Sequence, residues 1–399
     1  MTELIWQGKY DENGKRTAPL RVSLPFQTVE TINESTMERQ RMLDLFSAGR
    51  DSDWRNRLIW GDKKYVLPSL LDEFAGKVNL IYIDPPFNVG ADFSFTATIA
   101  DHPESEDEDE ETSFIKQSSV IEQKAYRDTW GKGLDSYLLW FYETVVLLRE
   151  LLADNGSLYV HLDYHIGHYA KTVLDEVFGQ DNFKNEIVWK RSLPHNDPKR
   201  YGSIHDVILF YTKGENYVFN QIFTEQSEKY KASHYTSKDE DGRVYRLQSL
   251  SASGSGPARR FGERVIEPPK GNHWRFSQDR IDQLLAEGRI VFTKNGTPNF
   301  KRYLDESKGS ALQSIWTDIN PVNSQAVERV DYTTQKPEAL LERIIKASSD
   351  EGDLVLDCFC GSGTSATTAE KLNRRWITCD LLSFEQTISA LFPRQIGSG

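Results

Sequence analysis

Short apolar runs alternate with amphipathic segments along most of the chain, a pattern typical of a parallel α/β sheet with helices on its faces. Within 134–156 and 336–353, apolar residues recur every three or four positions, which predicts helices, and Gly156 is expected to end the first. Further helices are expected over 65–76, 165–179 and 364–372. Seven apolar runs predict strands, at 58–61, 79–83, 157–162, 186–190, 206–211, 354–357 and 376–380.

The pattern divides the chain into four expected regions. An N-terminal extension covers 1–56, with a helix around Glu34–Phe46, while 57–214 and 331–399 carry the α/β pattern. Residues 215–330 interleave aromatic and basic residues with many Gly, Ser and Asn, which predicts an inserted, loop-rich domain. No long helix separates the strands 186–190 and 206–211, so they are expected to pair as antiparallel neighbours.

Charge and cysteine content narrow the class of protein. The net charge of −12 excludes a uniformly basic nucleic-acid binder, although a local basic face is enough to bind DNA. Eight acids within 100–112 predict a solvated, disordered insertion in a loop at about 98–125, because like charges repel. Three cysteines cannot form a disulfide framework and lack zinc-ligand spacing, and no signal peptide or membrane-spanning run is present. We therefore expect a soluble, cytoplasmic protein with no metal site.

A glycine-rich turn follows the strand at 354–357, in the stretch LVLDCFCGSGTSATTAEKL. Gly361 and Gly363 allow the backbone to turn tightly beside a ligand at the start of a helix, where free N–H groups attract anions. Asp357 lies inside the turn, and Asp380 ends the next strand, a position suited to ribose hydroxyls. The turn lacks the G-x-G-x-x-G spacing of dinucleotide sites, so S-adenosylmethionine fits better, with Asp357 at its ammonium group. The alternative is a turn that only packs helix on strand.

The cysteines of this turn, Cys358 and Cys360, and Cys379 on the next strand are expected to be small apolar fillers rather than redox groups.

A second turn, with the sequence DPPF, follows the strand at 79–83. Pro85 and Pro86 remove backbone donors and make the loop rigid, which leaves the carbonyl of Pro85 and the carboxylate of Asp84 as fixed acceptors. Two such acceptors suit an exocyclic amine, and Phe87 offers a flat face on which a base can stack. The alternative is a simple turn that ends a strand.

Together, DPPF and DCFCGSGT resemble the amino-group DNA methyltransferases, which modify adenine N6 or cytosine N4. The order of the two motifs resembles the beta class, and KGSALQSIWTDI with TTQKPEALLERIIKASSDEGD is similar to the modification subunits of Type III restriction–modification systems. The resemblance covers about 57–214 and 270–380. It implies a seven-stranded, mostly parallel, Rossmann-like sheet, circularly permuted, with an inserted target recognition domain. It also implies methyl transfer from S-adenosylmethionine to a base flipped out of the duplex, in a restriction–modification or phage-defence system.

The resemblance carries site residues with it. The expected catalytic residues are Asp84, Pro85, Pro86 and Phe87, and the expected cofactor-binding residues are Asp62, Gln335, Lys336, Pro337, Asp357, Phe359, Gly361, Ser362, Gly363, Thr364 and Asp380. Basic and aromatic residues of the inserted region are candidates for DNA contacts, namely Arg259, Arg260, Lys270, Trp274 and Arg275. Ordinary surface roles are at least as compatible with these five.

Adenine is favoured over cytosine by the resemblance alone, because the motif chemistry serves both amines. The expected partners are double-stranded DNA, a second copy of the chain, and a restriction or helicase subunit. Two other functions stay open from the sequence, namely methylation of an amine in RNA or another planar substrate, and a catalytically idle nucleic-acid-binding subunit of a defence complex.

Overall fold

The computed structural model describes residues 3–28, 54–86, 133–192, 199–323, 326, 328–330, 332 and 334–381, and the backbone alone of 94–98 and 113–117. The predicted helix around Glu34–Phe46, most of the acidic loop, and Phe87 lie outside these residues. The described chain forms two compact units, one made of 1–220 and 313–399 and the other of 221–312.

The first unit is built on an eight-stranded sheet in which the N-terminal and C-terminal parts of the chain interleave. Its strand order is β1-β20-β19-β2-β5-β7-β6-β18. Strand β7 is antiparallel to both neighbours, and every other described pair in this sheet is parallel. The strands are β1 Arg57–Trp60, β2 Val78–Ile83, β5 Leu152–Leu162, β6 Phe183–Lys190, β7 His205–Thr212, β18 Ile315–Trp316, β19 Leu354–Asp357 and β20 Arg375–Asp380.

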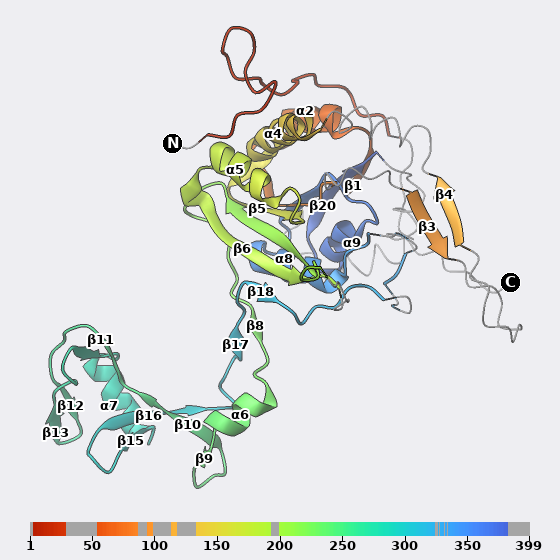
Figure 1. Cartoon of the computed structure of the whole chain (residues 1–399). Coiled ribbons are helices and arrows are strands. Elements are labelled where there is room, and N and C mark those ends of the chain that lie inside the picture. The colour runs from red at the N-terminus through yellow and green to blue at the C-terminus, as the bar shows by residue number, and fades with distance from the viewer. Residues whose placement is uncertain are drawn as a thin grey trace, which may run out of the picture. The chain divides into compact units, whose positions relative to one another are not determined.

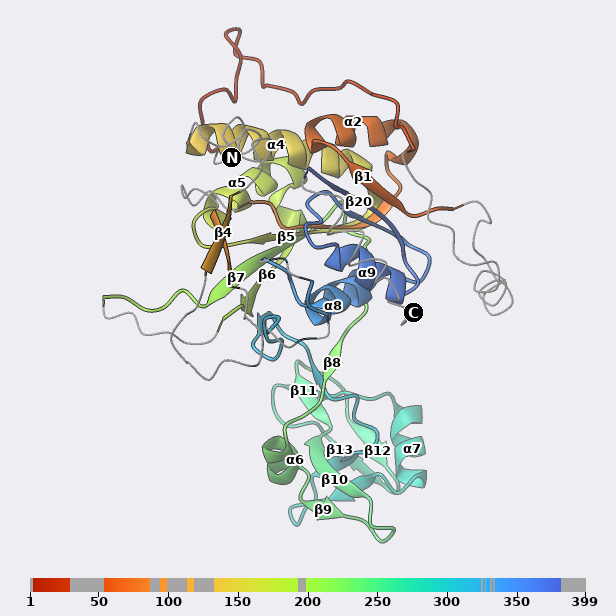
Figure 2. The ribbon, with the colours of Figure 1, turned by 90° about the vertical axis from the view of Figure 1, so that its right-hand side faces the viewer.

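Helices cover both faces of this sheet, so the first unit has three layers (Figures 1 and 2). One face carries α2 Lys63–Phe74, α4 Leu134–Leu151 and α5 Gly167–Phe178, and the other carries α8 Glu338–Ser348 and α9 Thr364–Lys371. The apolar faces of α2, α4 and α5 and the near-continuous apolar strands β2, β5 and β19 form one core. None of the helices in the described ranges is long and apolar enough to cross a bilayer.

The seven predicted strands are all present, and the predicted antiparallel pair is confirmed as β6 and β7. The structure adds the short edge strand β18, which pairs with β6. The prediction that Gly156 ends a helix is wrong, because α4 ends at Leu151 and Gly156 lies inside β5. The register between β2 and β5 shifts there, so Gly156 belongs to an irregular, bulged stretch of strand.

A short hairpin brackets the acidic block. Strands β3 Ser94–Thr98 and β4 Ser113–Gln117 pair as an antiparallel two-stranded sheet. Residues 113–117, which were expected to lie within a loop, are therefore extended and paired.

The N-terminal segment 3–28 is fixed to the helices of the first unit, over which it runs in Figure 2. The Lys9 side chain is fully buried, and its Nζ lies 2.7 Å from an oxygen of Glu176 on α5. Arg21 donates two hydrogen bonds to Glu150 on α4. A buried lysine needs such a partner, so these contacts make the segment part of the folded unit.

The second unit, 221–312, lies inside the predicted inserted region and has its own small core. A four-stranded antiparallel sheet, β15-β16-β10-β9, is accompanied by three two-stranded sheets and the helix α7 Gln278–Ala286. Its core contains Leu250, Phe261, Trp274, Ile281, Leu284 and Ile290. The other elements are α6 Glu228–His234, β8 Phe223–Thr224, β9 Ser237–Lys238, β10 Val244–Ser249, β11 Ser251–Ser253, β12 Arg259–Phe261, β13 Arg264–Ile266, β14 Asn272–Trp274, β15 Ile290–Phe292, β16 Pro298–Tyr303 and β17 Ser310–Ala311.

Candidate active site

The two motif turns lie side by side at one edge of the sheet. Strands β19 and β2 are adjacent and parallel, so the glycine-rich turn after β19 and the DPPF turn after β2 leave the sheet at the same edge. The edge of a parallel sheet at its carboxyl ends is where α/β folds place their ligands. Two turns that lie far apart in the sequence are thereby brought together.

The glycine-rich turn is held by Asp380, a contact that was not expected from the sequence. The Gly361 N–H donates a 2.8 Å hydrogen bond to Asp380 Oδ2. Gly363 caps α9 with φ +79°, a conformation that other residues rarely adopt. Gly361 has φ +48°, and a Cβ there would lie 3.0–3.1 Å from the ring of Tyr332. Both glycines are therefore required by the shape of the turn.

Asp357 is a buried carboxylate beneath this turn. It accepts hydrogen bonds from the Phe359 N–H at 2.9 Å and from the Ser365 hydroxyl at 2.5 Å. The pKa of Asp357 is raised to about 7. Burial is the main cause, and the nearby charges of Asp84 and Asp380 raise the pKa further, while the two hydrogen bonds offset part of this rise. The cluster of three carboxylates therefore favours a cationic ligand.

The remaining turn residues pack closely around this cluster. Ser362 and Thr364 are buried, and their hydroxyl oxygens are 2.9 Å apart. The rings of Phe359 and Trp140 form a T-shaped contact, and the Lys63 Nζ lies 4.5 Å from the centre of the Phe359 ring.

The three cysteine side chains, Cys358, Cys360 and Cys379, are buried, and burial raises the pKa of each thiol. They are therefore neutral thiols that fill space, as expected from the sequence.

Asp84 forms an ion pair with Lys336, which lies at the start of α8. Pro85 is buried and Pro86 half-buried, so the backbone of the turn is fixed against the unit. Lys336, which was expected to bind the cofactor, has its ammonium group on the carboxylate of Asp84 in this structure. Phe87 lies outside the described residues.

Gln335 and Pro337 shape the neighbouring loop. The Gln335 side chain accepts a hydrogen bond from the Val330 N–H and donates one to the Glu328 carbonyl. This holds the loop that carries Tyr332 against Gly361. Pro337 is the N-cap of α8, one position before the helix rather than inside its first turn.

Asp62 caps α2 at the end of β1. Its carboxylate accepts a 2.9 Å hydrogen bond from the Lys64 N–H, and the Gly61 N–H donates to the carbonyl of Asp380. Strand β1 pairs in parallel with β20, although the two lie at opposite ends of the sequence, as a circularly permuted sheet requires. Asp62 therefore lies at the same edge as Asp380.

Sequence reasoning missed a buried polar network next to the DPPF turn. The Tyr82 hydroxyl is 2.9 Å from His161 Nδ1, and His161 Nε2 is 3.1 Å from Asp206 Oδ2. These residues come from the neighbouring strands β2, β5 and β7, so the network joins the strands that carry Asp84 and Asp163. A polar residue inside an otherwise apolar strand, such as His161 in LYVHL, was the available signal.

Tyr332 and the Asp163–His165 pair were also missed. His165 Nδ1 lies 2.5 Å from Asp163 Oδ2, directly after β5 and at the edge that carries Asp84. Nothing in the periodicity distinguishes Tyr332, because its role depends on the close approach of Gly361.

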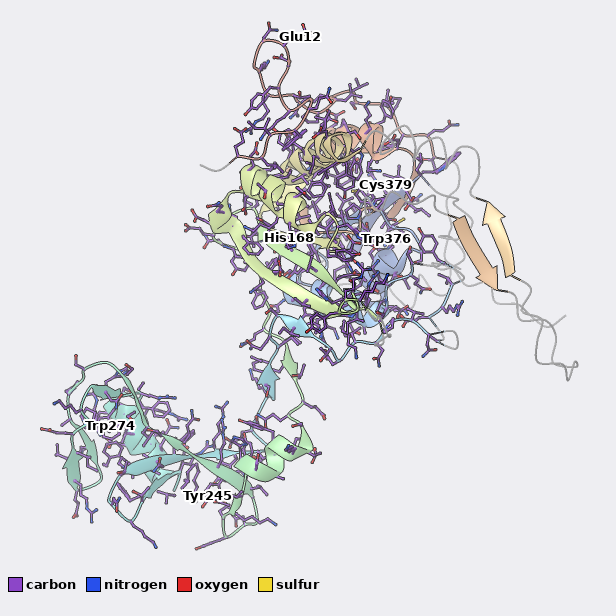
Figure 3. All side chains as sticks on the ribbon, in the orientation of Figure 1. Glu12, His168, Tyr245, Trp274, Trp376 and Cys379 are labelled. Atoms are coloured by element: carbon purple, nitrogen blue, oxygen red, sulfur yellow. The ribbon has the colours of Figure 1, made fainter. Side chains whose placement is uncertain are left out.

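In the second unit, Trp274 is a core residue. It is 7% exposed, its Nε1–H donates to the carbonyl of Ile266, and its ring makes an edge contact with the ring of Phe261. Figure 3 shows Trp274 among the strands of this unit. A role in base contacts is therefore not available to Trp274 in this conformation.

The four basic candidates remain on or near the surface of the second unit. Arg260 and Lys270 are exposed, and Arg259 is half-buried. Arg275 is exposed and donates to the Ser251 carbonyl.

Comparison with known proteins places the chain in a family. The profile of the family N6_N4_Mtase, described as DNA methylase, matches residues 78–390. The Type II methyltransferase M.EcaI of Enterobacter cloacae is 31% identical over 82% of this chain and 66% of its own length. The Type III restriction–modification enzyme StyLTI Mod subunit of Salmonella typhimurium is 28% identical over 82% of this chain and 52% of its own length.

A solved structure, the complex of M1.HpyAVI with SAM, aligns with 84% of this chain and 98% of its own, at 16% identity and a TM-score of 0.42. This chain spans between about half and two thirds of the length of the two curated relatives. Since the family profile covers most of the chain, the chain belongs to the DNA methylase family of N6 and N4 amino-methyltransferases, whose methyl donor is S-adenosylmethionine.

Proposed function

We propose that this chain transfers a methyl group from S-adenosylmethionine to the exocyclic amine of a base in double-stranded DNA, with adenine N6 as the target. The observation that carries the proposal is the adjacency of the two turns at the edge of β19 and β2. One turn has the shape and charge for the cofactor, and the other presents two acceptors for an amine.

The residues of the glycine-rich turn fit S-adenosylmethionine. Its ammonium and sulfonium groups are cationic, and Asp357, Asp84 and Asp380 interact electrostatically at this edge. Its carboxylate suits the N–H groups at the start of α9, directly after Gly363. We assign Asp357 to the ammonium group and Asp380, with Asp62 beside it, to the ribose and adenine side.

Asp84 and the Pro85 carbonyl are the proposed acceptors for the two amine protons. Accepting both protons makes the nitrogen lone pair available to the sulfonium methyl that the cofactor supplies. The nitrogen–carbon bond forms as the sulfur–carbon bond breaks, and the amine then loses one proton, for which Asp84 is the nearest proposed acceptor. Positioning and fixed charges supply the catalysis, without a covalent enzyme intermediate.

The ion pair with Lys336 has to open before Asp84 can accept an amine proton. Lys336 stands at the start of α8, beside the turn that receives the cofactor. Once released from Asp84, Lys336 would help the N–H groups at the start of α9 to hold the carboxylate of a bound cofactor. Phe87 follows Pro86 in the DPPF turn and is the proposed stacking surface for the flipped base.

The second unit is the proposed target recognition domain. It carries sixteen Lys and Arg against twelve Asp and Glu, a net charge of +4, within a chain of net charge −12. The name of the StyLTI relative describes a Mod subunit of a restriction–modification enzyme. By analogy, we propose that this chain modifies DNA in such a system and pairs with a second copy and with a restriction subunit.

The deciding experiment incubates the purified chain with S-adenosylmethionine and duplex DNA and identifies the methylated nucleosides by mass spectrometry. N6-methyladenine is the expected product. If the product is N4-methylcytosine, the proposed reaction is correct but the target base is cytosine. If the chain binds the cofactor but methylates neither base, the proposal is contradicted. RNA of the same sequence tests the other nucleic acid.

A further inference from the structure

The hairpin formed by β12 and β13, residues 259–266, presents an unusual surface in the second unit. Its two strands are joined by a two-residue turn in which Gly262 has φ +66°. Glycine at that place permits a tight hairpin whose twist matches its strands. The ribbon is therefore short, closed and well defined.

One face of this hairpin is tied to the core. Phe261 is buried, with ring contacts to Trp274 and Phe292 at centroid distances of 5.1 and 6.4 Å. Gln278 of α7 accepts a hydrogen bond from the Arg260 N–H and donates one to the Arg260 carbonyl. These contacts hold the hairpin rigidly on the unit, so the positions of its outward side chains are set in advance.

The hairpin also has exposed residues, from Gly262 to Val265 and at Arg260, which combine an apolar side chain with cations. Val265 is 73% exposed and lies directly across from Arg260, so the two share one face. Arg264 is exposed at the rim of the opposite face, where its guanidinium lies 5.9 Å from the centre of the Phe292 ring. The contact between Arg260 and exposed Asp282, at 3.3 Å, is a surface ion pair of little strength that phosphate can replace.

We propose that this hairpin enters the major groove of duplex DNA and reads base edges, with Val265 against a thymine methyl group and Arg260 and Arg264 on phosphates or guanine. The proposal rests on the proposed function. The major groove admits a two-stranded β-ribbon, and apolar side chains recognise the thymine methyl there. The unit's net charge of +4 complements the duplex, and rigid anchoring limits the entropy lost on binding.

The experiment compares full-length variants in two measurements. The wild type and the variants Val265→Asn, Val265→Ile, Arg264→Gln and Lys294→Gln are expressed in cells, and sequencing of modified bases gives the site that each methylates. Duplex binding is then measured over a range of salt concentrations. Lys294 lies in the exposed turn between β15 and β16, so Lys294→Gln removes the same charge elsewhere in the unit.

Arg264→Gln should lower the slope of log affinity against log salt concentration by about 0.9, the value for one lost phosphate contact. Val265→Asn should reduce discrimination at one A·T position about tenfold, and Val265→Ile should retain it. Affinity for S-adenosylmethionine should stay unchanged in every variant, which reports that the first unit is folded, and thermal unfolding curves compared with the wild type report that the second unit is folded.

If the wild type methylates DNA and both Arg264→Gln and Val265→Asn behave like Lys294→Gln, the hairpin is not the reading element, although the proposed function stands. If the wild type binds S-adenosylmethionine but no duplex, both proposals are overturned.

Discussion

The two compact units of this chain differ in the sign of their net charge and in whether the charged side chains are buried or exposed. In the first unit, the candidate site holds its key carboxylate, Asp357, beneath a turn at 3% exposure, and the unit as a whole carries a net charge of −16. In the second, the net charge is +4, and cations such as Arg264 and Lys270 lie on the surface. On the proposed function, the acidic residues of the first unit serve the cationic cofactor and the amine, and the basic residues of the second unit serve the phosphates.

This difference has a consequence for binding. A net charge of −16 repels the phosphate backbone at long range, so the overall charge of the first unit gives it no attraction to a duplex. On the proposed function, the second unit, with its net charge of +4, supplies the electrostatic attraction for DNA. Mutations in the second unit should therefore weaken DNA binding without changing cofactor binding, and mutations at the candidate site should slow methyl transfer without changing DNA binding.

Removal of the second unit should have the largest effect. Residues 221–312 leave and re-enter through the paired strands β8 and β17, where the Leu312 N–H donates to the Ile222 carbonyl. Asn220 is fixed to the end of α8 through the Ala347 carbonyl. A short Gly-Ser connection from Asn220 to Gln313 should leave cofactor affinity within about twofold and abolish duplex binding, as titration calorimetry and gel shifts would show.

If that shortened chain loses cofactor binding while it remains folded, the two units depend on each other. If it still binds duplex DNA at physiological salt, the first unit carries its own DNA surface.

Asp84→Ala should have the next largest effect, on chemistry alone. Loss of one fixed acceptor at the reacting group should lower the rate of methyl transfer by about 10² to 10³, while duplex affinity is unchanged. Asp154→Ala is the matched control, because this fully exposed carboxylate lies at the beginning of β5, away from the motif edge. If Asp84→Ala retains a tenth of the wild-type rate or more, Asp84 is not an acceptor for the amine protons during methyl transfer.

The strands and the two motifs of the first unit could be predicted because each is local. The run NLIYID contains a strand and the acid that ends it, and the glycines that turn the chain follow Asp357 within the same short motif. The pairing of Lys336 with Asp84 could not be predicted, since it joins residues 252 positions apart. The contact of Tyr332 with Gly361 could not be predicted for the same reason, because it depends on tertiary structure rather than on sequence spacing.

The second unit was predictable only in outline. Its strands are two to six residues long, too short for periodicity to define them. Trp274 shows the consequence, because its basic neighbours suggested a surface role, whereas packing with Phe261 makes it part of a small core. Composition indicated the charge of this unit correctly, since charge does not depend on how the chain folds.

Cofactor affinity should depend on pH through Asp357. Its pKa of about 7 means that the carboxylate is mostly protonated at pH 6 and mostly ionised at pH 8. Only the ionised form attracts an ammonium group, so affinity should rise about fivefold from pH 6 to pH 7.5, and it should fall again above pH 8 because the α-amino group of the cofactor, with an ordinary pKa of about 8, loses its proton. Calorimetry at several pH values measures this, with proton release on binding at pH 6. Asp357→Asn should bind more weakly, with a flat profile from pH 6 to pH 7.5. A wild-type profile that is flat over the same range would exclude Asp357 as the ammonium partner.

The smallest expected effect tests whether the units are also separate in stability. Trp274→Phe removes the hydrogen bond to the Ile266 carbonyl and some ring contact with Phe261, at a cost of about 1 kcal/mol in the free energy of unfolding of the second unit. Because Ile266 ends β13, duplex binding should weaken as temperature rises, while cofactor affinity follows the wild type. Trp376→Phe is the matched change in the first unit, where the indole donates to Glu370 beside the strand that carries Asp380. If each substitution lowers only the function of its own unit, chemistry and recognition have separate cores; if Trp274→Phe also weakens cofactor binding, the small core of the second unit supports the site as well.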